Sequence, residues 1–502
     1  MTRPRPALAA LWTLCAVLLV VGAWTALRAD AAGAAEPVTA VTAVTAVTAV
    51  TQGQGVFVPR GSLGTPLLPR LRSLLGLVVL TALAWSLSQD RSRIPWRVVL
   101  WGVGLQLVFA LFILKTALGV QIFATLNTLV VALLGFTVDG ASFVFGNLVY
   151  NNVPVGTGEL GNGDFAAAPG QVANTGAYFA FTVLPTIIFF SSLMTLLYHL
   201  GVMQRVVKGM AWVMQRTMKT SGAETLSAAG NIFVGQTEAP LLIKPFVARM
   251  TNSELMAVMT AGFATVAGGV MAAYVGMLLT HFPDIAGHLM AASVMSAPAA
   301  LVCAKLMVPE TERPETADTL EVSVERPDVN VIDAASRGAS EGLFLALNVG
   351  AMLLAFVAII SLLNGFLGWA GALAGFEGIS LERLMGWLLA PLAWLMGVSW
   401  ADAPVVGSLM GVKTVLNEFV AYLQLAGLMQ ADSGVTLQPR SVVIVTYALC
   451  GFANFSSIAI QLGGIGGMAP SRRHDLSRLG LRAMIGGTLA AFMTATIAGM
   501  IL

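Results

Sequence analysis

Charged residues are scarce in this sequence of 502 residues: they make up 10% of it, whereas ordinary globular proteins carry about a quarter. Apolar side chains make up 57%. The 27 Lys and Arg residues nearly balance the 25 Asp and Glu residues, so no basic field is available to bind nucleic acid. This composition excludes an ordinary soluble enzyme and favours a polytopic helical membrane protein.

Residues that carry covalent or metal chemistry are also few. The three cysteines, Cys15, Cys303 and Cys450, lie far apart in apolar runs, so they supply neither a disulfide framework nor a zinc site. The sequence shows no nucleophile paired with an activating base and no glycine-rich phosphate loop. The rings of like polar residues that form a channel filter are missing too. These absences argue against an enzyme and against a channel.

The first 70 residues read as processing and tethering segments. Residues 1–31 combine Arg3 and Arg5 with an apolar run and small residues, the layout of a secretory signal peptide; an uncleaved first helix is the alternative. Residues 32–70 contain a VTA repeat without the bulk to build a core, so we interpret them as a periplasmic low-complexity tether. Both interpretations place residue 70 outside the membrane.

Eight apolar runs are long enough, at about 20 residues, to cross a bilayer. They lie at about 71–88, 96–115, 176–200, 253–280, 284–307, 337–369, 440–466 and 479–502. The segments then left on the inner side are 89–97, 201–252, 305–340 and 470–482. These segments hold seventeen of the 27 Lys and Arg residues, as the positive-inside rule requires. The predicted protein is multi-pass with both mature ends periplasmic.

Two further runs enter the membrane without crossing it. Residues 221–250 are interrupted halfway by Gly, Pro and polar residues, and both of their ends lie on the inner side. Residues 384–428 behave similarly from the outer side and turn near residues 400–404. Each run is predicted to be a re-entrant hairpin, whose broken backbone must be buried in protein or face a water-filled cavity. A hairpin from each side indicates an inverted repeat.

A local echo in the sequence supports this repeat. The run GFAT (262–265) follows the first hairpin, and the run GFAN (451–454) follows the second. Small and polar residues come after both, so each helix is predicted to unwind midway. Discontinuous helices in matching halves indicate a transporter with a binding site near the middle of the bilayer.

Few polar side chains are predicted at these breaks, where a buried charge costs about 3 kcal/mol or more. Gln236 and Thr237 offer an amide and a hydroxyl to the edge of a planar solute, with Glu238 acting directly or through water. The alternative for Glu238 is a structural hydrogen bond to a neighbouring helix. Glu418 is suited to paired sugar hydroxyls, and its alternative is an ion pair with Lys413.

The second break also carries Asn454 and Ser457, which lie about one helical turn apart and can face one cavity. Such residues also join membrane helices, so they are weak evidence alone. An unwound turn leaves backbone carbonyls free to bind a hard monovalent cation. The candidates on the first hairpin's tip and the break facing it are Asn231, Val234, Thr265 and Val266.

Four runs in order resemble the concentrative nucleoside transporters. They are NIFVGQTEAPLLIKPF (231–246), AGFATVAGGVMAAYVGML (261–278), GVKTVLNEFVAY (411–422) and CGFANFSSIAIQLGGIGGMAPSRR (450–473). The resemblance covers roughly residues 72–502. It implies an all-α polytopic membrane protein of about eight transmembrane helices and two re-entrant hairpins, assembled as a homotrimer. It also implies symport of purine and/or pyrimidine nucleosides with sodium or, in some members, protons.

The resemblance further implies a role for individual residues. It assigns the nucleobase to Gln236, Thr237 and Glu238, with Val270 and Phe452 as apolar walls, and the ribose to Glu418, Asn454 and Ser457. It assigns sodium to backbone oxygens of Asn231, Val234 and Val266 and to the hydroxyl and carbonyl oxygens of Thr265.

We therefore expect a sodium-coupled nucleoside importer of the bacterial inner membrane that works by alternating access. Proton coupling and, less favoured, a nucleobase as the solute are the alternatives. The expected organisation is a signal segment (1–31), a tether (32–70), scaffold helices with an outer interfacial segment (71–200), the first hairpin and half of the transport domain (201–307), an acidic cytoplasmic loop (308–336), a scaffold or trimer helix (337–369), and the second hairpin with the second half (370–502).

Overall fold

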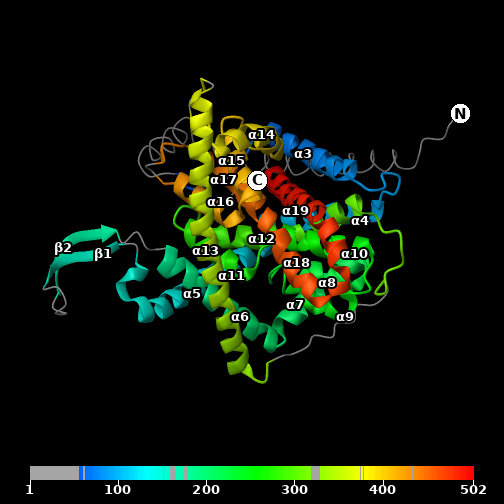
Figure 1. The fold of residues 1–502 in the computed structure, drawn as a ribbon, viewed down its shortest axis with the longest axis horizontal. Helices are drawn as coiled ribbons and strands as arrows, with labels where there is room; N and C mark the ends of the chain where they lie inside the picture. Colours follow the sequence, from blue (N-terminus) through cyan, green and yellow to red (C-terminus); the bar gives the residue numbers. More distant parts are fainter. Residues whose placement is uncertain are drawn as a thin grey trace.

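The structure is a computed structural model that describes residues 56–59, 63–150, 152–158, 165–174, 179–317, 328–373, 375–376, 378–430 and 433–502. The expected signal segment (1–31) and most of the expected tether (32–70) lie outside these residues. Where the tether region is described, Val56 and Val58 are buried, and their backbone N–H groups donate to Met429 O and His281 O. The described chain is almost entirely helical (Figure 1).

The N-terminal helices are α3 (Leu67–Ser86), α4 (Trp96–Lys115) and α5 (Ala117–Phe145). Within the described residues, eight helices are long and apolar enough to cross a bilayer. This set differs from the eight predicted runs in two ways. It includes Ala117–Val149, which was not predicted to cross the bilayer, and it lacks the predicted run 440–466, which forms two short helices. The range 71–200 therefore holds one long apolar helix that the sequence analysis treated as an interfacial segment.

After α5, a 3-10 turn (Gly146–Val149) leads to the only strands in the described ranges, β1 (Asn152–Gly158) and β2 (Phe165–Asn174). They pair antiparallel, with Asn152 opposite Asn174 and Gly158 opposite Phe165. Figure 1 shows this hairpin projecting from the helical body beyond α5. No strand was predicted in the range 71–200, which was expected to hold scaffold helices and an outer interfacial segment.

Residues 179–307 form the first half of an internal repeat. A π turn (Phe179–Val183) is followed by α6 (Leu184–His199), α7 (Val202–Met218), α8 (Gly222–Gly230), a 3-10 turn (Ala239–Ile243), α9 (Lys244–Val247), α10 (Asn252–Ala264), α11 (Gly268–Leu278) and α12 (Ile285–Met307). The predicted re-entrant hairpin is α8, the turn after it and α9. The predicted unwinding falls between α10 and α11.

Residues 331–501 repeat that order. They form α13 (Val331–Leu373), α14 (Leu381–Met396), α15 (Ala403–Val415), α16 (Glu418–Leu428), α17 (Pro439–Leu449), α18 (Phe455–Met468), a 3-10 turn (Pro470–Arg472) and α19 (Arg473–Ile501). The helix pairs α10–α11 and α17–α18 are the two interrupted helices. The inverted repeat and its broken helices therefore match the predicted fold class.

The turn predicted near residues 400–404 is present between α14 and α15. These helices pack so closely that a Cβ at Gly407 would lie 2.7 Å from Gly386 O. The polar tip lies later in the chain than this turn, at the break between α15 and α16, where Asn417 caps α16 by accepting from Val420 N at 2.9 Å. Helix-breaking residues are present at both places.

Helix α13 is the longest element and packs against α6 along one edge of the body (Figure 1). Its 43 residues correspond to about 65 Å at 1.5 Å per residue, against about 30 Å of hydrocarbon. Large apolar side chains on its outer face are exposed, for example Phe344 (68%), Leu354 (78%) and Leu362 (73%). This face is therefore suited to lipid or to another subunit.

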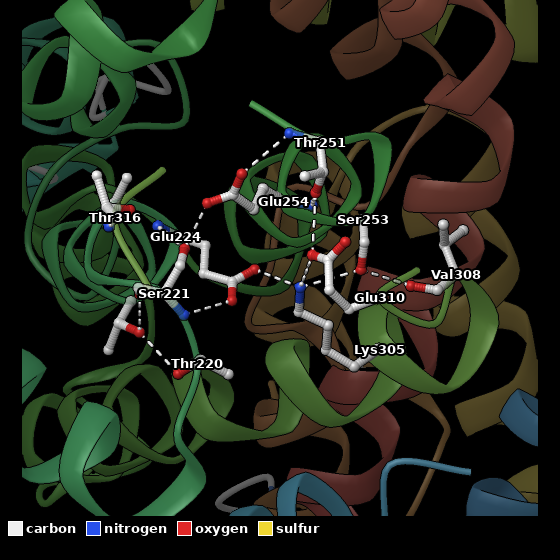
Figure 2. A network of polar contacts seen from close by, with 12 residues as sticks. Thr220, Ser221, Glu224, Thr251, Ser253, Glu254, Lys305, Val308, Glu310 and Thr316 are labelled. Atoms are coloured by element: carbon white, nitrogen blue, oxygen red, sulfur yellow. Dashed lines mark hydrogen bonds and ion pairs between the residues drawn. The ribbon is translucent and has the colours of Figure 1, made fainter. Parts of the chain in front are cut away.

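Helices α8 and α10 begin with the same local motif. Ser221 and Thr251 are N-caps, and Glu224 and Glu254 reach back to the capping residues' backbone N–H groups at 2.8 and 2.9 Å, which completes a capping box in each helix. The two boxes are joined, because Ser221 Oγ donates to Glu254 Oε1 at 2.5 Å (Figure 2). The start of the hairpin is thus tied to the start of the interrupted helix.

Lys305, near the end of α12, is the cation of this network (Figure 2). Its Nζ lies 2.7 Å from Glu224 Oε2 and 3.2 Å from Glu310 Oε2, and it donates to Ser253 Oγ at 3.0 Å. The side chains of Lys305 and Glu224 are 5% and 1% exposed. Removal of one partner of such a buried pair leaves an uncompensated charge.

We predict that Lys305→Met lowers the stability of the folded protein by about 3–5 kcal/mol, because Glu224 loses its cation in a buried site. The measurement is the thermal unfolding midpoint of the purified protein in detergent. Lys208→Met removes an exposed lysine of α7 and is the matched control. Equal midpoints for the two variants would contradict this role of Lys305.

Candidate functional site

A cavity of about 140 Å³ lies where the two hairpin tips meet the two helix breaks. Its lining includes all eight predicted solute-binding residues: Gln236, Thr237, Glu238, Val270, Glu418, Phe452, Asn454 and Ser457. Asn417, Phe419, Ser456 and Ile460 also line it, together with Leu345, Val349 and Met352 from α13. Residues more than 200 positions apart in the sequence therefore form one pocket.

Glu418 is the charged group of the second hairpin's tip, and it is only 4% exposed. Its Oε1 accepts from Tyr274 OH at 2.9 Å, and its Oε2 accepts from Asn454 Nδ2 at 3.0 Å. Lys413 Nζ donates instead to Ala448 O at 2.8 Å. The carboxylate is thus held by two neutral donors at the cavity wall, and the direct Lys413 ion pair is not the contact that forms.

Gln236 lies across the same cavity on the first hairpin's tip and is 7% exposed. Its Nε2 donates to Ser457 Oγ at 3.1 Å, and its Oε1 accepts from Gln461 Nε2 at 3.0 Å. Ser457 N donates to Asn454 Oδ1 at 2.9 Å, which caps α18. One chain of hydrogen bonds therefore runs from Gln236 through Ser457 and Asn454 to Glu418.

Glu238 is an exposed residue of the first tip and lines the cavity. Its Oε2 accepts from Gly235 N at 3.1 Å, so its hydrogen bond is to its own tip rather than to a neighbouring helix. Glu238 also lines a second, larger cavity of about 340 Å³ with Gln204, Lys244 and Arg337. Because those three residues lie in the segments predicted to be inside, the second cavity extends from the site toward the inner side.

The four predicted cation ligands lie where the first tip meets the break between α10 and α11. Gly268 N donates to Phe233 O at 3.0 Å and joins the two segments. Asn231 is fully buried at the end of α8, and its Oδ1 has no hydrogen-bond partner. Val234 and Val266 are buried beside it, on the tip and the break.

Thr265 keeps acceptor capacity on both of its oxygens. Its hydroxyl donates to Ala261 O at 2.9 Å, so the lone pairs of Oγ1 stay available. Its carbonyl accepts from Phe452 N at 3.2 Å, which uses one of the two lone pairs of that oxygen. The donor set consists of oxygens only, and the described residues contain no cluster of His, Cys, Asp or Glu that would hold a transition metal. Oxygen donors suit a hard cation such as sodium.

Besides the additional lining residues, two residues that bond the cavity's polar groups from behind were missed. Tyr274 on α11 binds Glu418, and Gln461 on α18 binds Gln236. A signal for Gln461 was available, because it lies four residues after Ser457 and therefore shares its helix face. Tyr274 had no such signal, since its partner lies 144 positions away in the sequence.

Comparison with known proteins gives three family matches in chain order. The family described as "Na+ dependent nucleoside transporter N-terminus" matches residues 75–148, "Nucleoside recognition" matches residues 180–280, and "Na+ dependent nucleoside transporter C-terminus" matches residues 288–499. The matches together cover both halves of the repeat.

Similar proteins span bacteria and mammals. An "Uncharacterized transporter" of Haemophilus influenzae is 46% identical over 86% of this chain and 97% of its own length. "Sodium/nucleoside cotransporter 1" of Mus musculus is 42% identical over 86% of this chain. "Solute carrier family 28 member 3" of the same organism is 41% identical over 85% of this chain. The matched region is 64% and 58% of the length of these two mouse proteins.

Solved structures agree with these sequence matches. "Structure of CNTnw in an inward-facing substrate-bound state" is 42% identical, with a TM-score of 0.76 over 86% of this chain and 97% of that one. A CNTnw variant in an outward-facing state is also 42% identical, with a TM-score of 0.77 over 87% of this chain and 98% of that one. The fold is therefore shared with structures in opposite-facing states.

Proposed function

The chain belongs to the family of Na⁺-dependent, concentrative nucleoside transporters, and we propose that it imports nucleosides across the bacterial inner membrane by sodium-driven symport. Like its relatives, it is a transporter and not an enzyme. Sodium is the coupling ion of the family. The import direction, the cellular membrane and the coupling of this chain are our proposals.

The observation that carries the proposal is the shared cavity with its two unlike polar walls. One wall carries the donor and acceptor groups of Gln236, Thr237 and Glu238, which suit the edge of a nucleobase. The opposite wall carries Glu418 beside Asn454, and a carboxylate there accepts from paired ribose hydroxyls. Val270 and Phe452 supply the apolar surface on which a planar base packs.

Sodium, when bound, supplies a positive charge that draws together the oxygens of the first tip and the facing break. Asn231, Val234, Thr265 and Val266 would hold it, and the unpartnered Asn231 Oδ1 adds a further oxygen. These residues are covalently continuous with Gln236 on one side and with Val270 on the other. Cation binding therefore favours the geometry that binds the nucleoside, and the effect on affinity is reciprocal.

Alternating access follows if the two hairpins and interrupted helices move against α13 and the N-terminal helices. The larger cavity reaches the site at Glu238 and opens toward residues of the predicted inner segments, which supports an inward-open arrangement. The exposed apolar face of α13 suits lipid or another subunit, and we propose that a homotrimer interface covers part of it. Proton coupling and a nucleobase as the solute are the alternatives to be tested.

We expect labelled uridine to accumulate in proteoliposomes under an inward sodium gradient and not under a proton gradient alone. Adenosine should compete, whereas free uracil and adenine should compete poorly because they lack the ribose that Glu418 and Asn454 bind. Accumulation under a proton gradient alone would show that protons, and not sodium ions, drive uptake. Equal competition by uracil and uridine would identify the solute as a nucleobase.

Glu418→Gln should reduce nucleoside uptake by at least about tenfold. The new amide group loses the charge-assisted hydrogen bonds, which contribute about 1.5–3 kcal/mol each. The control is Glu382→Gln, because Glu382 also accepts from an asparagine, Asn364 Nδ2 at 2.9 Å, but lies outside the cavity. If Glu418→Gln takes up nucleoside at the wild-type rate and its thermal unfolding midpoint is unchanged, Glu418 does not bind the solute.

Thr265→Ala should raise the sodium concentration for half-maximal uptake by about fivefold, since one oxygen ligand contributes roughly 1 kcal/mol. The order of preference among nucleosides should stay the same. Thr265→Ser keeps the hydroxyl and should behave like the wild-type protein. If Thr265→Ser is impaired as strongly as Thr265→Ala, the hydroxyl is not a cation ligand.

A further inference from the structure

Gln461 lies on α18 directly behind Gln236 and is fully buried. Its Nε2 donates two hydrogen bonds, to Met259 O at 3.1 Å and to Gln236 Oε1 at 3.0 Å. Gln461 does not line the cavity. Any influence it has on the solute must therefore act through Gln236.

The backbone carbonyl of Met259 fixes the orientation of both amides. A carbonyl oxygen only accepts, so the group of Gln461 that faces it must be the NH₂ group. The second hydrogen of that NH₂ group points at Gln236, whose facing atom must then be its carbonyl oxygen. Gln236 is consequently held with its own NH₂ group toward Ser457 and the cavity.

An amide NH₂ group has two hydrogens. One hydrogen of Gln236 Nε2 is used by Ser457 Oγ at 3.1 Å, and the other is left for the solute. We propose that Gln461 is a positioning residue that makes Gln236 a hydrogen-bond donor toward the nucleobase, so that the site favours bases with an exocyclic carbonyl oxygen over bases with an exocyclic amino group. This inference rests on the proposed function, in which Gln236 contacts the base.

The groups hydrogen-bonded to the Gln236 amide do not reverse its polarity. Ser457 Oγ accepts from Gln236, while Ser457 N donates to Asn454 Oδ1, so Asn454 turns its Nδ2 toward Glu418. Gln461 and Asn454 are thus each oriented by a backbone group that only accepts or only donates, and Gln236 is oriented in turn by Gln461. A base with an amino group at the Gln236 contact would place two donors face to face, and one of them would be left unpaired.

Gly262 provides the space for the contact between the two glutamines. A Cβ at this position would lie 2.7 Å from Gln461 Nε2 and 3.0 Å from Gln236 Cβ. Gly262→Ala therefore displaces the end of the Gln461 side chain without altering a polar residue. It perturbs the orientation of Gln236 by a second and independent route.

The test compares uridine with cytidine and inosine with adenosine, because each pair differs in an exocyclic carbonyl against an amino group. We expect sodium-driven uptake by the wild-type protein to favour uridine and inosine, in kcat/KM, by at least about tenfold, which corresponds to about 1.4 kcal/mol. In Gln461→Leu, where Gln236 is free to turn, both ratios should fall toward one. Gly262→Ala should lower them in the same direction.

Matched controls separate this effect from a general loss of packing. Gln106→Leu removes another fully buried glutamine, which bonds Gly102 O on α4. Gly467→Ala changes a glycine of α18 that has open space around it. Both controls should keep the wild-type ratios.

The outcomes distinguish the two proposals. If the wild-type protein takes up none of the four nucleosides, the proposed function fails and this inference fails with it. If uptake occurs but the wild-type protein does not discriminate, or if the ratios persist in Gln461→Leu, the positioning role alone is overturned. Loss of all uptake in Gln461→Leu together with an unchanged ratio in Gly262→Ala would also overturn it.

Discussion

Backbone groups at an interrupted helix end cannot be satisfied by lipid, and the centre of this protein is built around that constraint. At the end of α17, Lys413 and Tyr422 from the second hairpin donate to Ala448 O and Thr446 O at 2.8 and 2.6 Å. At the start of α16 and of α18, an asparagine accepts from the third residue of the helix. Side chains of the second hairpin thus satisfy backbone carbonyl groups that the break after α17 leaves without helical partners.

This use of polar side chains at helix ends explains why the site is polar in a protein with so few polar residues. Side chains that cap one helix end also face the cavity, as Asn454 does between Ser457 N and Glu418. The same groups thus hold the fold and present hydrogen-bonding atoms to the cavity. Stability and recognition share one set of residues, which limits how far the site can change without loss of the fold.

The sequence predicted the parts of this arrangement that rest on local chemistry. The GFAT and GFAN runs identified both breaks, and the eight predicted solute-binding residues line one cavity. Pairings between distant segments were not predictable, since nothing near Tyr274 indicates that it binds Glu418. The turn near Pro404 is where it was predicted, but the later break at Asn417 was not identified as the polar tip, because both places carry helix-breaking residues. Helix α5 was overlooked because apolar length alone does not separate it from an interfacial segment.

The pocket also has one wall that does not belong to the repeat's hairpins or broken helices. Leu345, Val349 and Met352 come from α13, whose length exceeds the lipid's thickness. If the site moves along this helix, as the proposed mechanism requires, its polar atoms would move together while the apolar α13 side chains that contact it would be replaced by others. The affinity for the solute would then differ between the two sides of the membrane through its apolar contacts alone, while the polar contacts stay unchanged.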